Sequence, residues 1–120
     1  MDIEAVEVAV TDIMLSLGVP AHISGYRYLR NAIVLSVGNM DLISAMTKQL
    51  YPAVAEKYGS TPSRVERSIR HAVEMAWDRG DIDTLQKFFG STVSRSRGKP
   101  TNSEFIAMIA DHVTMEMKRK

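Results

Sequence analysis

Apolar residues recur at intervals of three and four along every long segment of this 120-residue chain. This period places them on one side of an α-helix, whereas a strand would alternate apolar and polar residues, and no segment shows that alternation. Glycine, proline and capping residues separate the periodic segments from one another. The predicted helices cover residues 3–17, 25–37, 41–58, 62–78 and 82–89, and a sixth follows residue 101. We therefore expect an all-α, compact six-helix domain.

Three local signals refine these boundaries. Pro52 lies inside the third predicted helix and predicts a bend or a split, because proline lacks a backbone donor and clashes with the preceding turn. The segment 91–100, STVSRSRGKP, has no apolar period and is predicted to be a loop. Thr101 and Glu104 then form the Thr-x-x-Glu pattern of a capping box, which predicts the start of the last helix.

The composition excludes several classes of protein. The chain has no cysteine, so a disulfide framework, a thiolate zinc site and a cysteine nucleophile are ruled out. No apolar run approaches the roughly 18 residues of a membrane span. The acidic start lacks the basic residues of a secretory signal. With 45% hydrophobic and 24% charged residues, the composition is that of a globular protein. We expect a single cytoplasmic domain over residues 1–120, without membrane association.

The net charge of +1 is the sum of an acidic first half and a basic second half. Residues 1–60 hold 4 Lys/Arg against 6 Asp/Glu, whereas residues 61–120 hold 11 against 8. Arg64, Arg67 and Arg70 fall within seven positions, and His71 follows directly. A basic face of this kind can bind a polyanion even when the whole chain is nearly neutral.

Residues 46–78 have the pattern of a helix-turn-helix, in which two helices are joined by a short turn. The small side chain of Ala55 allows the two helices to approach, and Gly59, four positions later, permits a left-handed turn. The next inner position after Val65 should fall about three residues later, but Ser68 stands there and Ile69 is the apolar residue. We expect a recognition helix over residues 62–78 that is rotated or longer than in the simplest examples.

A helical wheel divides the predicted recognition helix, residues 62–78, into an apolar and a basic side. At about 100° per residue, five residues fall between roughly 80° and 180° from Arg64. These are Val65, Ile69, Ala72, Val73 and Ala76. Arg64, Arg67 and His71 cluster on the opposite side, with Arg70 on their flank. Arginine and glutamate side chains on such a helix can read base edges in the major groove. The alternative is a solvated helix face on which Glu66 and Glu74 are surface partners of the arginines.

Other charged residues carry weaker signals. The basic residues Lys48, Arg95, Arg97 and Lys99 are candidates for phosphate contacts, although a basic loop is more often only solvated. His22, His71 and His112 have no metal-ligand spacing. Asp78, Asp81 and Asp83 lack the twelve-residue loop of a calcium site, so helix capping is the preferred interpretation. We expect neither a cofactor nor an enzymatic activity.

Five stretches carry a resemblance to a known family: residues 18–23, 25–30, 47–52, 63–71 and 99–108. Among them, SRVERSIRH and KPTNSEFIAM are the most specific. They resemble the C-terminal effector domain of the stage-zero sporulation response regulators, transcription factors of endospore-forming bacteria that act in a two-component phosphorelay. The resemblance implies a six-helix DNA-binding domain whose recognition helix carries Ser63, Arg64, Glu66, Arg67, Arg70 and His71. It also implies contact with the RNA polymerase sigma subunit through about residues 79–89, where Arg79, Asp81, Asp83, Thr84 and Phe89 are candidates.

The sequence therefore predicts a sequence-specific DNA-binding domain that activates or represses promoters, with double-stranded DNA and the sigma subunit as partners. A homodimer on DNA is a further expectation. The phosphoacceptor receiver domain of the family is not contained in the 120 residues. The alternative from another class is an all-α protein–protein interaction module whose basic helix docks an acidic partner.

Overall fold

The computed structural model describes residues 2–90 and 98–119, and within them all regular secondary structure is helical. The α-helices are α1 (Ile3–Ser16), α2 (Ser24–Gly38), α3 (Tyr51–Tyr58), α4 (Pro62–Arg79), α5 (Ile82–Phe89) and α6 (Asn102–Arg119). A 3-10 helix, η1 (Met40–Ala45), and a π-helical turn, η2 (Met46–Leu50), lie between α2 and α3. The predicted all-α fold with six α-helices is confirmed.

The prediction of one helix over residues 41–58 is wrong in its first half. Ala45 leaves the helical region with φ −129° and ψ 43°, which separates η1 from η2. Pro52 lies in the first turn of α3, where its missing amide hydrogen costs no hydrogen bond. In η2 the backbone amide of Tyr51 donates to the carbonyl of Met46, five residues earlier. This wider turn avoids the clash that a regular α-helix would create before the proline.

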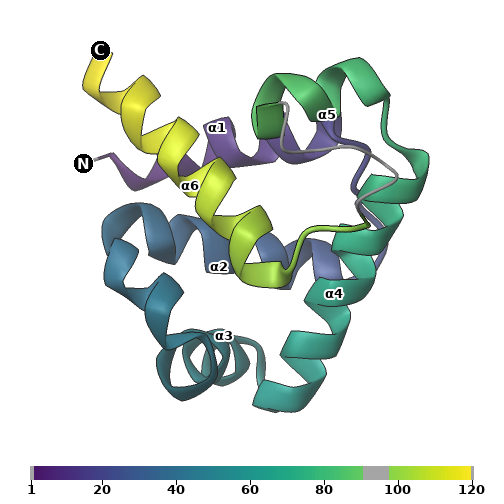
Figure 1. The fold of residues 1–120 in the computed structure, drawn as a ribbon. Coiled ribbons are helices and arrows are strands. Elements are labelled where there is room, and N and C mark those ends of the chain that lie inside the picture. Colours follow the sequence, from purple (N-terminus) through teal and green to yellow (C-terminus); the bar gives the residue numbers. More distant parts are fainter. Residues whose placement is uncertain (1, 91–97, 120) are drawn as a thin grey trace.

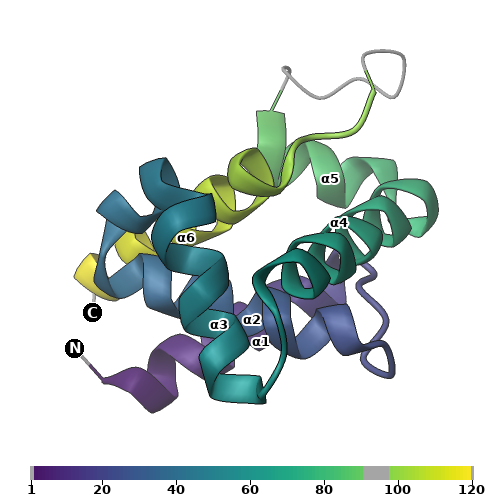
Figure 2. The same cartoon turned by 90° about the horizontal axis from the view of Figure 1, so that it is seen from below.

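Helix α2 forms the centre of the domain, where it packs against α1, α4 and α6 (Figure 1). Each of these helices sends fully buried apolar side chains inward, among them Val10, Leu29, Ile69 and Phe105. Figure 2 shows the same arrangement from below, with α3 and α4 packed together and joined by a short turn. In both views the two chain ends lie near each other, on the other side of the domain from α4.

An aromatic cluster anchors α5. The ring of Phe89 packs edge-on against Trp77 of α4, with 6.0 Å between ring centroids, and lies 5.3 Å from the ring of Phe105 of α6. Leu85 is also fully buried. An eight-residue helix is too short to be stable alone in water, so these contacts hold α5 in place.

The predicted capping box at the start of α6 is confirmed. The hydroxyl of Thr101 accepts a hydrogen bond from the backbone amide of Glu104 at 3.2 Å, and the Glu104 carboxylate accepts one from the backbone amide of Thr101 at 2.9 Å. This reciprocal pair satisfies two backbone donors at the helix start. None of the helices in the described ranges combines the length and apolar character needed to cross a lipid bilayer.

Candidate nucleic-acid interface

A glycine in the left-handed conformation joins α3 to α4. Gly59 has φ 61° and ψ 39°, a conformation that favours glycine, and the amide of Ser60 donates to the carbonyl of Ala55 at 2.9 Å. Thr61 then caps α4, because its hydroxyl accepts from the backbone amide of Arg64 at 3.3 Å. Local residues thus produce the predicted turn, and α4 begins with its first residues at the surface.

Helix α4 is divided as the helical wheel predicts. Its five predicted inner residues are Val65, Ile69, Ala72, Val73 and Ala76, and all are buried. The candidate reading residues Ser63, Arg64, Arg67, Arg70 and His71 are exposed, and Glu66 is half-buried beside them. The first three turns of α4 therefore present donor-rich side chains outward while the opposite side fills the core.

The departure at Ser68 has a structural cause. A Cβ atom built on Gly25 of α2 would lie 2.1 Å from the backbone oxygen of Ser68, so the two helix backbones are almost in contact at this point. A large apolar side chain in place of Ser68 is not needed, because α2 itself covers this side of α4. Ile69, one position later, supplies the buried apolar group.

The three arginines of α4 differ in their partners. Arg70 forms an ion pair with Glu66, one turn earlier, with 2.7 Å between Nη1 and Oε1. Within residues 2–90 and 98–119, neither Arg64 nor Arg67 takes part in an ion pair. These two guanidinium groups are therefore available to a ligand without breaking an existing pair.

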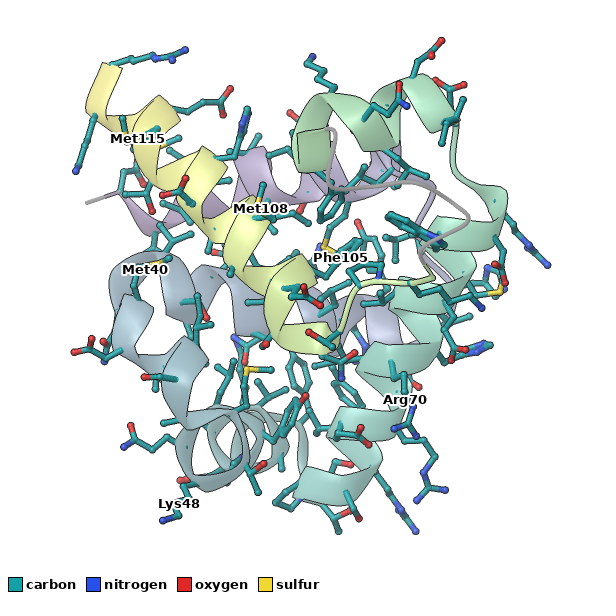
Figure 3. The ribbon with its side chains drawn as sticks, in the orientation of Figure 1. Met40, Lys48, Arg70, Phe105, Met108 and Met115 are labelled. Atoms are coloured by element: carbon teal, nitrogen blue, oxygen red, sulfur yellow. The ribbon has the colours of Figure 1, made fainter. Side chains whose placement is uncertain are left out.

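The candidate phosphate contacts fall in different environments. Lys48 of η2 is exposed and points away from the domain at the end formed by α3 and α4, the same end at which Arg70 projects outward (Figure 3). Lys99 lies 3.3 Å from the carboxylate of Asp78 and 3.5 Å from that of Glu74. The hydrogen bond to Asp78 raises the pKa of the Lys99 ammonium. Arg95 and Arg97 lie outside the described residues.

Helix α2 contributes residues to this face that no pattern in the sequence indicates. Its Ser24 and Tyr28 line a shallow hollow of about 290 Å³ together with Tyr58 and Ser60 of the turn and with Arg64 and Arg67. The guanidinium of Arg27 lies 5.4 Å from the centre of the Tyr58 ring, which is a cation–π distance. More than thirty positions separate these α2 residues from α4, so no local pattern could reveal the contact.

The segment after α4 only partly matches the predicted contact surface. Arg79, Asp81 and Asp83 are exposed, but Phe89 is 95% buried, so its assignment to a protein-binding surface is wrong. Phe89 fills the space between α4 and α6 instead. Asp81 caps α5, because its carboxylate accepts from both the backbone amide and the hydroxyl of Thr84, at 3.2 and 3.1 Å.

No group of three or more His, Asp or Glu side chains is arranged to hold a metal ion in the part of the chain that the structure describes. His112 instead approaches Glu116 on the same helix, with 3.7 Å between Nε2 and Oε1. The exposed α4 face presents mainly charged hydrogen-bond donors, of which Arg70 is paired with Glu66.

Exposed basic side chains on the second helix of a helix-turn-helix, within an all-α domain, are typical of DNA-binding transcription-regulator domains. The family model described as "Sporulation initiation factor Spo0A C terminal" matches residues 10–113, which reach from α1 to α6. The chain belongs to this family, the C-terminal domain of a sporulation response regulator, and the resemblance drawn from its sequence motifs is confirmed. The family is one of transcription factors rather than enzymes.

Proposed function

We propose that this domain binds double-stranded DNA in a sequence-specific manner by placing the first three turns of α4 in the major groove. The residues that contact DNA in this proposal are Ser63, Arg64, Glu66, Arg67, Arg70 and His71. The major groove is wide enough for an α-helix and displays a different donor and acceptor pattern for each base pair. Family membership supports this function.

The observation that carries the proposal is that Arg64 and Arg67 are exposed and unpaired with any carboxylate of the described residues. Both are exposed on the side of α4 that faces away from the core, and neither belongs to an ion pair in the described chain. A guanidinium group can donate two parallel hydrogen bonds to guanine, which is the commonest specific contact in the major groove. Arg70 is paired with Glu66, so a contact between Arg70 and DNA would have to accommodate this ion pair.

Basic residues around α4 would hold the DNA backbone. We assign phosphate contacts to Lys48 of η2 and to Arg27 at the start of α2, both exposed near the helix-turn-helix. Arg95 and Arg97 remain candidates from their position in the sequence. Lys99 is a weaker candidate than Lys48, because a phosphate would have to compete with Glu74 and Asp78 for its ammonium group.

We also propose that the exposed side of α5 contacts the sigma subunit of RNA polymerase and that the domain binds DNA as a homodimer. Arg79, Asp81 and Asp83 are exposed, with Thr84 half-buried beside them. Carboxylates on this surface would be repelled by DNA phosphates, which favours a protein partner. A footprint that covers two half-sites about one helical turn apart would support the homodimer.

Selection of bound duplexes from a random pool tests the DNA-binding proposal. We expect enrichment of one sequence whose binding survives excess competitor DNA. The double variant Arg64→Ala/Arg67→Ala should lose the enrichment. Lys118→Ala/Arg119→Ala removes the same charge from the exposed end of α6 and should retain it. Binding without enrichment would contradict the proposal. Absence of DNA binding, together with capture of an acidic protein, would favour the docking-module alternative.

A further inference from the structure

Asn102 connects the start of α6 to both helices of the helix-turn-helix. The residue is 91% buried, and its amide nitrogen Nδ2 donates two hydrogen bonds. One goes to the Tyr51 hydroxyl of α3 at 3.0 Å, and the other to the backbone carbonyl of Glu66 of α4 at 3.1 Å. These bonds join residues that are 51 and 36 positions apart in the sequence.

The contact at Glu66 lies across α4 from the contact with α2. Gly25 approaches the backbone oxygen of Ser68, two residues after Glu66. Two residues correspond to a rotation of about 200° around a helix axis. Helices α2 and α6 therefore hold α4 from nearly opposite sides at the same level. The exposed side chains of Arg64 and Arg67 lie between these two contacts.

We propose that Asn102 is a positioning residue that sets the orientation of α4 relative to α3 and α6 and thereby the direction of its base-reading side chains. The geometric part of this inference stands alone, whereas its consequence for base reading rests on the proposed function. Asn102 binds the backbone carbonyl of Glu66, and the carboxylate of Glu66 is paired with Arg70. Asn102 is thus connected through Glu66 to one of the candidate reading side chains.

The position requires the chemistry of an asparagine. Both hydrogens of one amide nitrogen are used, so an isosteric aspartate, whose carboxylate has no donor at neutral pH, cannot replace it. The capping box formed by Thr101 and Glu104 fixes the backbone on either side of Asn102. The amide thus projects from an anchored helix start into the space between α3 and α4.

Spin labels test the geometric part without DNA. Because the full chain has no cysteine, labels can be placed by Ser63→Cys on α4 and Met108→Cys on α6, two exposed positions. In a background of Asn102→Ala, we expect the distance distribution between these labels to broaden or shift. A label pair on Val8→Cys and Met115→Cys, which joins α1 to α6, should be unchanged.

Asn31→Ala is the matched control, because Asn31 is also a buried asparagine, with 8% exposure, and lies in the middle of α2. It should leave the distance between α4 and α6 unchanged. If Asn102→Ala does not fold, as judged by helical circular dichroism, Tyr51→Phe removes only one of the two hydrogen bonds and keeps the ring. It should then give a smaller change in the same direction.

The DNA part of the test compares the duplex selected above with a random duplex. Asn102→Ala should weaken binding of the selected duplex about tenfold, the order expected when one base contact is misdirected, and that of the random duplex less than about twofold. An unchanged α4–α6 distance distribution would overturn the positioning role. A changed distribution with equal loss on both duplexes would overturn the link to base reading. Absence of any sequence preference in the unmodified chain would instead contradict the proposed function.

Discussion

The guanidinium of Arg70 donates a 2.7 Å hydrogen bond to the carboxylate of Glu66, one turn earlier on α4. The two side chains are 54% and 35% exposed. A pair so accessible to water adds only about 0.3–0.5 kcal/mol to the stability of a helix. Its effect on the fold is therefore small. Its main consequence is that Arg70 already has a charged partner, whereas Arg64 and Arg67 form no ion pair within the described residues.

We predict that Arg64 and Arg67 each read a base. Replacement of either by alanine should cost about 1–3 kcal/mol of binding free energy for the selected duplex and relax the preference at one base pair. Competition binding with single-base variants of the duplex measures both effects. If selected and random duplexes lose affinity equally, the arginines contact only phosphates.

Glu66 is expected to contribute specificity rather than affinity. Glu66→Ala releases Arg70 and removes a negative charge near the DNA, so binding of the selected duplex should weaken while binding of random DNA stays equal or strengthens. A double-mutant cycle with Arg70→Ala should show that the two losses are not additive. A uniform gain on every sequence would mean that Glu66 is only a repulsive charge.

A charge reversal at Asp83 should separate polymerase contact from DNA binding. Asp83 is exposed in the first turn of α5 and makes no ion pair within the described ranges. Asp83→Lys should leave operator affinity unchanged and lower activated transcription in vitro, while the loss of a carboxylate at the helix start should cost no more than about 1 kcal/mol of stability. Asp81 is unsuitable for this test because it caps the helix. Normal transcription by Asp83→Lys and by Arg79→Glu would show that this surface has another role.

The stability of the domain should depend on the ionisation of Glu104. A hydrogen bond from the Thr101 backbone amide holds the pKa of the Glu104 carboxyl below its ordinary value, and a hydrogen bond with the Thr101 hydroxyl lowers this pKa further. A lowered folded-state pKa means that the stabilisation is complete above the unfolded-state pKa and is lost as the pH falls through the folded-state pKa.

Glu104→Gln should therefore melt at a lower temperature than the unmodified chain at neutral pH, and the difference should disappear in acid. Thermal melting over a pH series measures this. A difference that stays constant across the acidic range would show that the carboxylate charge does not contribute.

Two glycines of α2 should respond in opposite ways to alanine. At Gly25 a Cβ would lie 2.1 Å from the Ser68 backbone oxygen, so Gly25→Ala must separate α2 from α4 and should cost at least about 1–3 kcal/mol of unfolding free energy. At Gly38 nothing lies within 4 Å of the added atom, and Gly38→Ala should be neutral or stabilise by up to about 1 kcal/mol. Urea unfolding of both variants measures the change in unfolding free energy. Equal changes for Gly25→Ala and Gly38→Ala would contradict the close approach of α2 to α4 at Gly25.

Local signals were sufficient to place most helix boundaries and the two faces of α4. Gly59, the Thr61–Pro62 pair and the Thr101–Glu104 capping box act on backbone groups within four residues, so their effect can be read from neighbouring positions. The same holds for the alternation of buried and exposed residues on α4, because the helix period alone decides which side chains share a side.

Packing between distant segments decided the rest. The close approach of Gly25 to Ser68 accounts for a polar residue at an inner position of α4, and the aromatic contacts of Phe89 remove it from the surface. In the sequence, Asn102 is only one of the residues within a capping box. In the structure its side chain donates hydrogen bonds to two helices that precede it by 36 residues or more. Such contacts depend on how helices cross in space, and no periodicity within one helix encodes which residue of another helix it will meet.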